Sequence, residues 1–338
     1  MQTLTLLNPM DMHLHLREGA MLEGVLPYTA QIFSAAVVMP NLTTPITNTA
    51  LAKDYQKQIL SLCAPSSFKP LMTLFITESL NLQELQEAKK AGIKILKLYP
   101  KGATTGSEGG VKEILSDNTL QVFQYAQDLG FILSIHGESN GFSLEREYEF
   151  LPIFEHIAQN FPKLQTIIEH LSDARSLDMV EKYPNLYATL TLHHISMSLD
   201  DVLGKGLNPH HFCKPILKTK KDQQALLQAA LNAHPKVSFG SDSAPHLESA
   251  KLTANGAAGI FAAPILLPAL ATLFEEHNAL ENLQTFISQR AIENYHLTDF
   301  PQKSITLSRK PFVIPERIMT PLGAVIPLWA GKTLNWSL

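Results

Sequence analysis

The sequence predicts an α/β protein: a (β/α)8 barrel of the TIM type with a small C-terminal appendage. Apolar, often β-branched runs alternate with segments whose apolar residues recur at helical spacing. About eight such strand–helix units follow one another before the pattern changes after Pro301. The chain has 338 residues and is 45% hydrophobic, which suits a barrel of about 250 residues with an addition.

The predicted strands are short apolar runs, several of which end in a polar residue. They lie near Met10–Leu16, Ala36–Pro40, Pro70–Ile76, Ile93–Leu98, Phe131–His136, Gln165–His170, Leu186–Leu192 and Val237–Asp242. The clearest helical patterns between them are Leu82–Ala88, Thr119–Leu129, Leu177–Tyr183 and Asp222–Ala233. A doubly wound open sheet shows the same alternation and stays the alternative. No GxGxxG follows the first strand, which disfavours the nucleotide-binding form of that sheet.

The C-terminal part of the chain changes in character. We expect residues 1–300 to form the barrel and residues 301–338 to form an appendage that packs on it and does not fold independently. Ser304–Ser308 and Phe312–Ile314 are predicted to be short strands, and a turn is predicted at Gly331.

One uncharged stretch, Gly256–Phe274, is long enough to span a membrane. Pro264 and Pro268 interrupt it, so we predict a loop followed by a buried helix with Pro264 in its first turn.

Charge and cysteine content exclude some classes of partner and compartment. Lys plus Arg number 27 and Asp plus Glu number 31, and this balance predicts neither a nucleic-acid partner nor a membrane partner. Cys63 and Cys213 lie far apart and form no CxxC motif, which indicates a reducing, cytoplasmic environment. The first residues lack the basic segment of a signal peptide.

A metal centre is predicted at the C-terminal ends of the strands. His13 and His15 stand two residues apart in an extended run, so both side chains project from one face. Two neutral imidazoles on one face can bind one divalent metal. His136, His170 and Asp242 end three further strands, on the barrel face where active sites are built. The pattern therefore predicts a metal-dependent hydrolase, in which Asp242 both binds metal and accepts a proton; a helix cap or an Asx-turn is the structural alternative for Asp242.

Lys97 alternates with Ile95 and Ile93 along one face of its strand. A lysine that points into the barrel is desolvated, which lowers its pKa and leaves more neutral amine. A neutral amine adds carbon dioxide to form a carbamate, an anionic ligand with two oxygens. The alternative is a lysine whose ammonium group reaches water.

Groups suited to an anionic substrate surround these positions. Arg17 follows His15 by two residues and can bind a carboxylate with two parallel hydrogen bonds. Asn41 and His246 are further candidates. Arg17 or Asn41 can instead be an ordinary rim group, and His246 can either reach the substrate or cap its own loop. The glycine-rich loop 101–110 carries Thr104 and Thr105 and suits either a lid or a passive surface loop.

With these residues assembled, the chain resembles the amidohydrolase superfamily, and within it the dihydroorotases of the shorter bacterial (class II) type. The matching motifs run through nearly the whole chain: Asp11-Met12-His13-Leu14-His15-Leu16-Arg17, Val38-Met39-Pro40-Asn41, Lys97-Leu98-Tyr99-Pro100, Ser134-Ile135-His136-Gly137-Glu138, Glu169-His170, Pro215-Ile216-Leu217-Lys218, Ser241-Asp242-Ser243-Ala244-Pro245-His246 and Leu328-Trp329-Ala330-Gly331. His-x-His alone would indicate only the superfamily, whereas the lysine and aspartate motifs together are highly specific.

The resemblance implies a site with two Zn²⁺ ions. It places His13, His15 and Asp242 on one ion and His136 and His170 on the other. Lys97, carboxylated on its side-chain nitrogen (N6-carboxylysine) by carbon dioxide, would bridge them together with a hydroxide. The implied substrate contacts are His15, Arg17, Asn41, His136, Lys214, His246 and Ala258, and Thr104 and Thr105 match the lid threonines.

Two positions depart from the family pattern or stay unassigned. Position 214 often holds an apolar residue in relatives, but the family contact there is made by the backbone. His194 matches a family histidine to which we assign no role, and His193 stands beside it.

The resemblance also implies an activity and an assembly. The activity is the reversible cyclisation of N-carbamoyl-L-aspartate to (S)-dihydroorotate plus water in pyrimidine (UMP) biosynthesis, with Asp242 as general acid and base, and the assembly is a homodimer. One alternative is another cyclic-amide hydrolase, of the hydantoinase or dihydropyrimidinase kind, against which Arg17 and Asn41 argue. The other is a catalytically silent homologue that serves as an assembly partner.

Overall fold

The core of the molecule is one parallel sheet of eight strands. A computed structural model describes residues 2–65 and 67–338. Each strand of the sheet pairs in parallel with the next in the chain, from β2 to β9. Their bounds are β2 Met10–Leu14, β3 Ala35–Val38, β4 Lys69–Phe75, β5 Ile95–Leu98, β6 Ile132–Ile135, β7 Gln165–Ile168, β8 Leu186–Leu190 and β9 Val237–Phe239. The eight strands predicted from the sequence are thereby confirmed, most of them one to three residues shorter at the C-terminal end.

The first and last strands close the sheet into a barrel. A parallel bridge joins Leu14 to Ser243, and the His15 N–H donates to the Ser243 carbonyl at 3.0 Å. The Asp242 N–H donates to the His13 carbonyl at 2.7 Å. These bonds join β2 and β9 at the rim, so the predicted barrel is confirmed over the open sheet. Closure also brings residues near position 13 and position 242 side by side.

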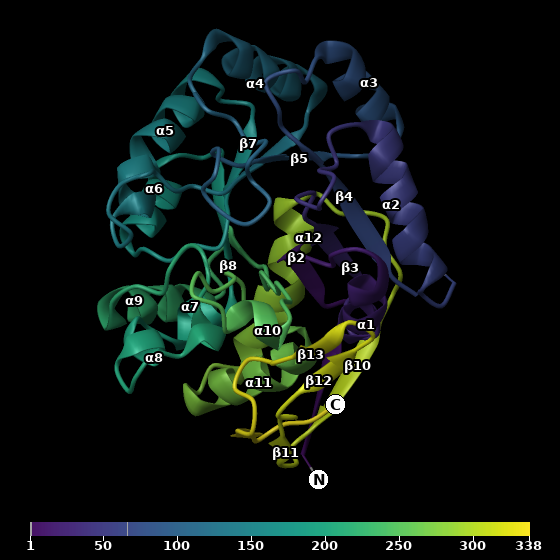
Figure 1. The fold of residues 1–338 in the computed structure, drawn as a ribbon, viewed down its shortest axis with the longest axis vertical. Helices are drawn as coiled ribbons and strands as arrows, with labels where there is room; N and C mark the ends of the chain where they lie inside the picture. The colour runs from purple at the N-terminus through teal and green to yellow at the C-terminus, as the bar shows by residue number, and fades with distance from the viewer. Residues whose placement is uncertain (1, 66) are drawn as a thin grey trace.

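Helices cover the outside of the barrel, and α2 to α6 follow its outer edge in Figure 1. The helices are α1 Gly19–Ala30, α2 Thr49–Ser61, α3 Leu82–Lys90, α4 Asp117–Leu129, α5 Arg146–Asn160, α6 Arg175–Lys182, α7 Leu192–Ser196, α8 Asp200–Leu203, α9 Lys220–Leu231, α10 Glu248–Lys251, α11 Leu266–Glu276 and α12 Arg290–Asn294. Local sequence determines where some of these helices begin and end. Thr219 and Asp222 form a capping box at the start of α9. Gly130 ends α4 in the left-handed conformation at φ 67°.

The barrel interior is apolar toward the N-terminal ends of the strands. Met10, Met12, Ile95 and Ile167 form a buried cluster there with Tyr295, which follows α12. A larger apolar cluster fills the space between the strands and the helices. The two clusters hold the strands rigidly, which fixes the positions of the side chains at the opposite rim.

The stretch Gly256–Phe274 forms a loop and a buried helix, as predicted, but its start differs. Pro264 lies in a short 3₁₀ turn, Ala263–Ile265, and Pro268 lies in the first turn of α11. Among the residues described, no helix is both long and apolar enough to cross a bilayer.

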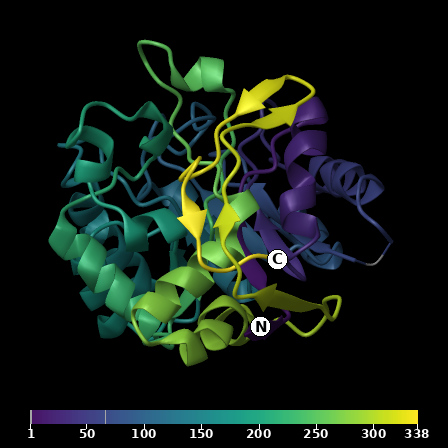
Figure 2. The same cartoon turned by 90° about the horizontal axis from the view of Figure 1, so that it is seen from below.

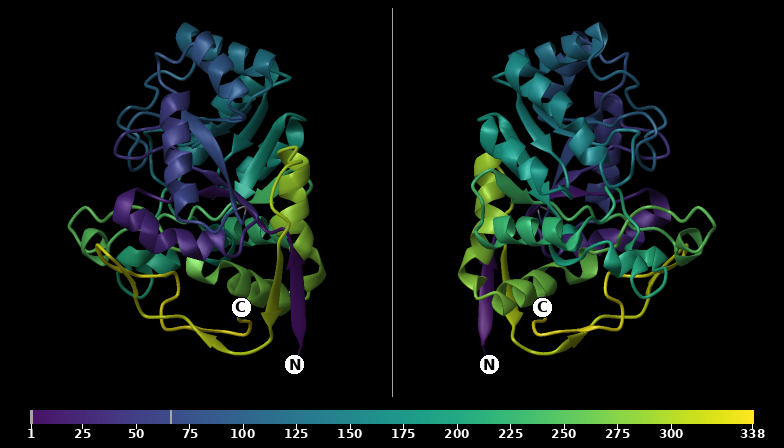
Figure 3. Two further views of the ribbon diagram at one scale, coloured as in Figure 1. Left: turned by 90° about the vertical axis from the view of Figure 1, so that its right-hand side faces the viewer. Right: turned by 90° about the vertical axis from the view of Figure 1, so that its left-hand side faces the viewer.

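The C-terminal segment forms small antiparallel pairs beside the barrel, as Figures 2 and 3 show. The predicted strand Ser304–Ser308 is confirmed as β10, and the next is β11, Phe312–Val313, which pairs with β14, Thr333–Leu334. A further pair joins β12, Ile318–Thr320, to β13, Gly323–Val325.

The N-terminal strand β1, Thr3–Leu7, was not predicted and pairs with β10 along its whole length. The first residues thus join the appendage. The division at residue 300 stays a prediction.

Candidate active site

Six predicted metal ligands converge at the C-terminal rim of the barrel. His13 lies in β2 and Lys97 lies in β5. The other four, His15, His136, His170 and Asp242, follow the ends of β2, β6, β7 and β9 by one to three residues. His13, Lys97, His136, His170 and Asp242 are all buried, and the His15 side chain is 10% exposed. The five separate regions of sequence meet because parallel strands of a barrel end at one rim.

His13, His15 and Asp242 form one cluster. Asp242 Oδ1 lies 3.1 Å from His15 Nε2 and 3.5 Å from His13 Nε2. The ligand atoms of all three lie within 4.8 Å of one another. Zinc with Zn–N distances of about 2.0–2.1 Å in a tetrahedral site separates neighbouring donor atoms by about 3.3 Å. The observed spacing therefore fits one shared cation.

His136 and His170 form the second pair. His136 Nδ1 lies 3.1 Å from His170 Nε2, again close to the separation of two donors on one zinc. His136 Nε2 lies 2.7 Å from Glu138 Oε2, so the hydrogen belongs on Nε2 and Nδ1 is left with a lone pair. The inward-facing nitrogen of His136 is thus prepared to bind metal.

Lys97 is fully buried, and its ammonium nitrogen has no hydrogen-bond partner in the described part of the chain. Burial lowers its pKa to about 8, although Glu169 and Asp242 oppose this shift. Tyr99 places its ring 4.9 Å from the Lys97 nitrogen. A buried ammonium group without a partner is costly, so its environment raises the fraction of neutral amine, the form that adds carbon dioxide.

The backbone is held in the left-handed region at three of the site residues. The φ angles are 58° for Arg17, 42° for His170 and 42° for Asp242. Non-glycine residues adopt this region at a cost and cluster at functional sites when they do. A left-handed residue interrupts the regular extended backbone, so β7 and β9 end before the predicted His170 and Asp242.

Glu169 was quoted only as part of a motif, yet it holds three elements of the site together. Its carboxylate accepts from His13 Nδ1 at 2.8 Å, Thr189 Oγ1 at 2.6 Å and Ser134 Oγ at 2.5 Å. Burial alone would raise the pKa of Glu169, but His13, Lys97 and Ser134 outweigh it and hold the value at about 2. The ionised carboxylate keeps the hydrogen of His13 on Nδ1, which leaves Nε2 free to bind metal.

Asp11 is a second residue to which the sequence analysis gave no role. Its carboxylate accepts from the Ser241 N–H at 2.8 Å, from Ser241 Oγ at 2.6 Å and from the His13 N–H at 3.2 Å. It therefore joins the loop that carries Asp242 to the strand that carries His13. The signal in the sequence was a carboxylate two residues before His13, the first histidine of the His-x-His pair.

Burial sets the protonation of the ligands. It lowers the pKa of His13, His15 and His170, so these imidazoles are neutral at neutral pH and offer lone pairs. It raises the pKa of Asp242 above the usual carboxyl value, against the attraction of His13 and His194.

Arg17 and His246 form the rim on one side. Arg17 Nη2 lies 3.0 Å from His246 Nε2, which also lies 2.9 Å from the Ala258 carbonyl. Burial lowers the pKa of His246 to about 3, so the ring is neutral. Nε2 then forms a hydrogen bond with only one of its two neighbours at a time. It either carries a hydrogen, which it donates to the Ala258 carbonyl, or a lone pair, which accepts from Arg17. When it donates to Ala258, the Arg17 N–H is left for a bound anion.

The loop 101–110 covers the other side. Asn41 donates its amide to the Thr105 carbonyl at 2.9 Å, and Lys214 donates to the Ala103 carbonyl at 3.0 Å. Gly106 lies at φ 70°, and a Cβ there would approach the Asn41 carbonyl to 3.1 Å. The Lys214 side chain thus supports the loop.

These groups enclose a small cavity above the metal ligands. The predicted residues that line it are His13, His15, Arg17, Asn41, Thr104, Thr105, His136, His170, Lys214, Asp242 and Ala258. Tyr99, Ala244 and Gly259 also line it and were not predicted. Lys97 is buried beneath this lining, and His246 reaches the cavity through Arg17.

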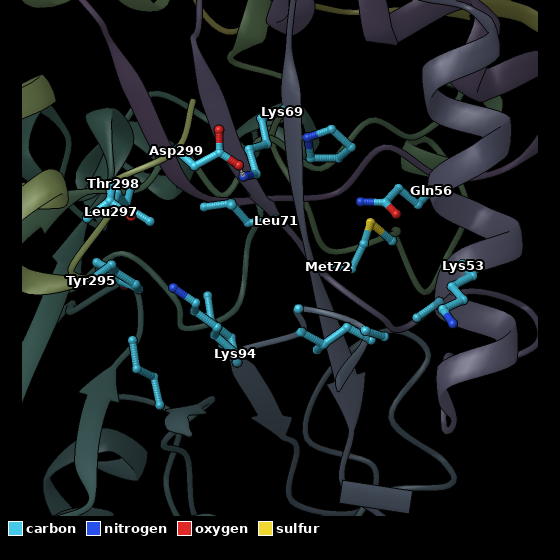
Figure 4. A pocket seen from close by; sticks show the side chains of 17 residues that line it. Lys53, Gln56, Lys69, Leu71, Met72, Lys94, Tyr295, Leu297, Thr298 and Asp299 are labelled. Atoms are coloured by element: carbon cyan, nitrogen blue, oxygen red, sulfur yellow. Dashed lines mark hydrogen bonds and ion pairs between the residues drawn. The ribbon is translucent and has the colours of Figure 1, made fainter. Parts of the chain in front are cut away.

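A larger cavity of about 310 Å³ lies at the opposite end of the barrel, shown in Figure 4. It is bounded by α2, the beginnings of β4 and β5, and the segment 295–299. Its described lining has one carboxylate, Asp299, which pairs with Lys69, and no histidine. The N-terminal face of such barrels serves stability, so the catalytic groups and the larger cavity are separate.

Comparison with known proteins agrees with this geometry. The amidohydrolase family model matches residues 78–282. The dihydroorotase of Helicobacter hepaticus is 72% identical over 337 residues, which cover 100% of this chain and 98% of the relative.

Two solved structures extend the match. The dihydroorotase of Campylobacter jejuni is 42% identical with a TM-score of 0.94, over 99% of this chain and 97% of that one. The Saccharomyces cerevisiae dihydroorotase, solved in complex with 5-fluoroorotic acid, is 34% identical with a TM-score of 0.94, over 100% and 98% of the two chains.

The barrel, the convergent ligands and the family match define a cyclic amidohydrolase. Within that superfamily, the chain belongs to the dihydroorotases.

Proposed function

We propose that this chain catalyses the reversible cyclisation of N-carbamoyl-L-aspartate to (S)-dihydroorotate plus water, in pyrimidine biosynthesis. The observation that carries the proposal is the pairing of two ligand clusters with Arg17 at one rim. The clusters suit hydrolysis or formation of an amide bond, and a guanidinium with a free N–H suits the ring carboxylate.

The side chains fit two divalent cations. His13, His15 and Asp242 would hold one Zn²⁺, and His136 and His170 would hold the other. The unpartnered Lys97 amine supports a bridging role, because carbon dioxide added to this nitrogen would form a carbamate, with release of a proton, whose two anionic oxygens could bind the cations. Bound zinc supplies Lewis acidity, which polarises the amide carbonyl and makes water more acidic.

Asp242 is proposed to move the proton. In hydrolysis it takes a proton from the attacking water and passes it to the departing ring nitrogen. In cyclisation it acts first as an acid, as microscopic reversibility requires. Burial raises the pKa of Asp242 toward neutral pH, which favours both uptake and release of a proton. Oδ1 faces both histidines, so we assign proton transfer to the second oxygen.

The other rim residues are proposed to position the substrate. Arg17, Asn41 and His246 would hold the free carboxylate, with contacts from His15, His136, Ala258 and the backbone of Lys214. Thr104 and Thr105 would donate hydrogen bonds from the loop above. Because these groups would bind a ring carboxylate that dihydrouracil lacks, they favour dihydroorotate as the substrate.

Parallel rate assays with dihydroorotate and dihydrouracil test the proposal. We expect turnover of dihydroorotate and little of dihydrouracil. Equal rates on both would favour a dihydropyrimidinase-like enzyme, and a metal-loaded protein inactive on both would favour the silent homologue.

We also propose a cytoplasmic homodimer. The dimer rests on the family resemblance, and the compartment rests on two cysteines that are both free thiols. Sedimentation at micromolar concentration measures the first and cell fractionation the second.

A further inference from the structure

A second group of soft metal ligands lies outside the active site. His193 and His194 belong to α7, which is labelled in Figure 1. Cys213 lies in the segment that follows the 3₁₀ turn Pro209–His211. One ligand atom from each lies within 4.8 Å of the other two. The exposed fractions are 0% for His193, 2% for His194 and 1% for Cys213.

His193 has no polar partner in the described part of the chain. Both of its ring nitrogens are buried and neither makes a hydrogen bond. A buried polar atom without a partner costs about 1–3 kcal/mol, and such atoms are rare in folded proteins. Burial also lowers the pKa of His193 well below its usual value, so protonation does not relieve the deficit. The ring is left with a lone pair that no described atom uses.

The carbonyl of Pro215 lies beside the other two ligands. His194 Nε2 is 3.0 Å from this oxygen and Cys213 Sγ is 3.2 Å from it. The other nitrogen of His194 lies 2.9 Å from Thr191 Oγ1. One buried cluster therefore holds two imidazoles and a thiol, and a carbonyl oxygen lies beside two of its three members. Ligation by His194 replaces one of its present hydrogen bonds.

We propose that His193, His194 and Cys213 bind a third metal ion, Zn²⁺, with the Pro215 carbonyl as the oxygen that completes the site. Nitrogen and sulfur donors at four-coordinate positions are the set that zinc prefers. On binding, Cys213 releases its thiol proton and coordinates as the thiolate, and no electron is transferred. The ion gives the otherwise unpartnered His193 a ligand bond.

The site would connect two parts of the substrate cavity. α7 follows β8 at the rim, and Cys213 directly precedes Lys214, which lines the cavity and supports the loop 101–110. A metal between α7 and Cys213 therefore fixes the segment that carries Lys214. The role is structural, and the inference is independent of the proposed catalytic activity.

Cobalt substitution tests the site directly. Metal-free full-length protein is loaded with Co²⁺, and the near-ultraviolet charge-transfer absorption of a cobalt–thiolate bond is recorded. The six proposed active-site ligands include no sulfur, so the band reports binding by a cysteine, and the two cysteine variants show which one. The variants are Cys213→Ser and His193→Gln, with Cys63→Ser as the matched control because Cys63 lies after α2. Circular dichroism checks the fold of each protein.

We expect the band in the wild type and in Cys63→Ser, its loss in Cys213→Ser, and its loss or clear weakening in His193→Gln. Metal analysis should fall by one ion per chain in Cys213→Ser. A cobalt-loaded wild type without the band would overturn the proposal and leave water as the partner of His193. A band that survives in Cys213→Ser, or an unchanged band in folded His193→Gln, would overturn it equally.

Discussion

Replacing Glu169 is expected to weaken metal binding although Glu169 is not itself a proposed ligand. Its carboxylate accepts three hydrogen bonds, from His13, Thr189 and Ser134. In Glu169→Gln the amide oxygen can still accept from His13 and Thr189 if the amide NH₂ group turns toward Ser134. The negative charge is lost, and His13 is then held by a neutral hydrogen bond.

The magnitude follows from the nature of these bonds. A hydrogen bond to a charged group is roughly twice as strong as a neutral one, so Glu169→Gln loses on the order of 1–2 kcal/mol at His13. That difference corresponds to about tenfold weaker zinc binding. Glu169→Leu removes all three acceptors and frees the His13 ring, and we expect about 100-fold weaker binding, at the upper end for partners that orient metal ligands.

The assay is competition between the protein and a chromogenic zinc chelator at fixed pH. The control is Glu155→Gln, since Glu155 is a surface carboxylate that bonds Lys182 far from the site. Thermal unfolding of the metal-free proteins separates weaker binding from loss of fold. Wild-type zinc affinity in both folded Glu169 variants would refute the argument that Glu169 fixes the metal-binding tautomer of His13.

Three further outcomes are expected. Arg17→Lys should lower kcat/KM for dihydroorotate about 10–100-fold, mainly through KM, because an ammonium group cannot form two parallel hydrogen bonds with a carboxylate. The surface control Arg309→Lys should leave the kinetics unchanged, and unchanged kinetics in Arg17→Lys would contradict the prediction. Lys97 has a folded pKa of about 8, below its ordinary 10.5, so its neutral fraction falls about tenfold per pH unit below that value. Recovery of activity by metal-free protein given zinc at a fixed concentration of dissolved carbon dioxide should therefore slow about tenfold from pH ~7 to ~6 and level off above ~8. A flat profile would count against carboxylation of Lys97. Gly106→Ala should lower kcat/KM about tenfold because its positive φ and the nearby Asn41 carbonyl strain any side chain; activity equal to wild type would argue against a role for this loop.

Much of the barrel was predictable from the sequence. Buried parallel strands are continuous apolar runs, and each of the eight was recognisable because a polar or helical segment followed it. The strand ends were placed too late at His170 and Asp242, since left-handed backbone at these residues depends on tertiary contacts that no local pattern reveals. β1 was missed because its partner, β10, lies about 300 residues away in the chain.

The convergence of the candidate ligands was predictable, but the network of hydrogen bonds around them was not. His13 and His15 share a strand face, and this short-range geometry is readable from spacing alone. The hydrogen bonds from His13 to Glu169 and from Ser241 to Asp11 join residues on different strands. No local pattern in the sequence predicts such partners. The hydrogen bond from the Lys214 side chain to the Ala103 carbonyl in the loop 101–110 was not predictable either, because the two residues are 111 positions apart.

The central claim is that Asp242 moves a proton within a preassembled metal centre. The most direct measurement is the kcat of Asp242→Asn with dihydroorotate, taken together with its bound metal. The account predicts a loss of at least about 100-fold in kcat in protein that still binds metal and folds. Wild-type turnover in metal-loaded Asp242→Asn would contradict it.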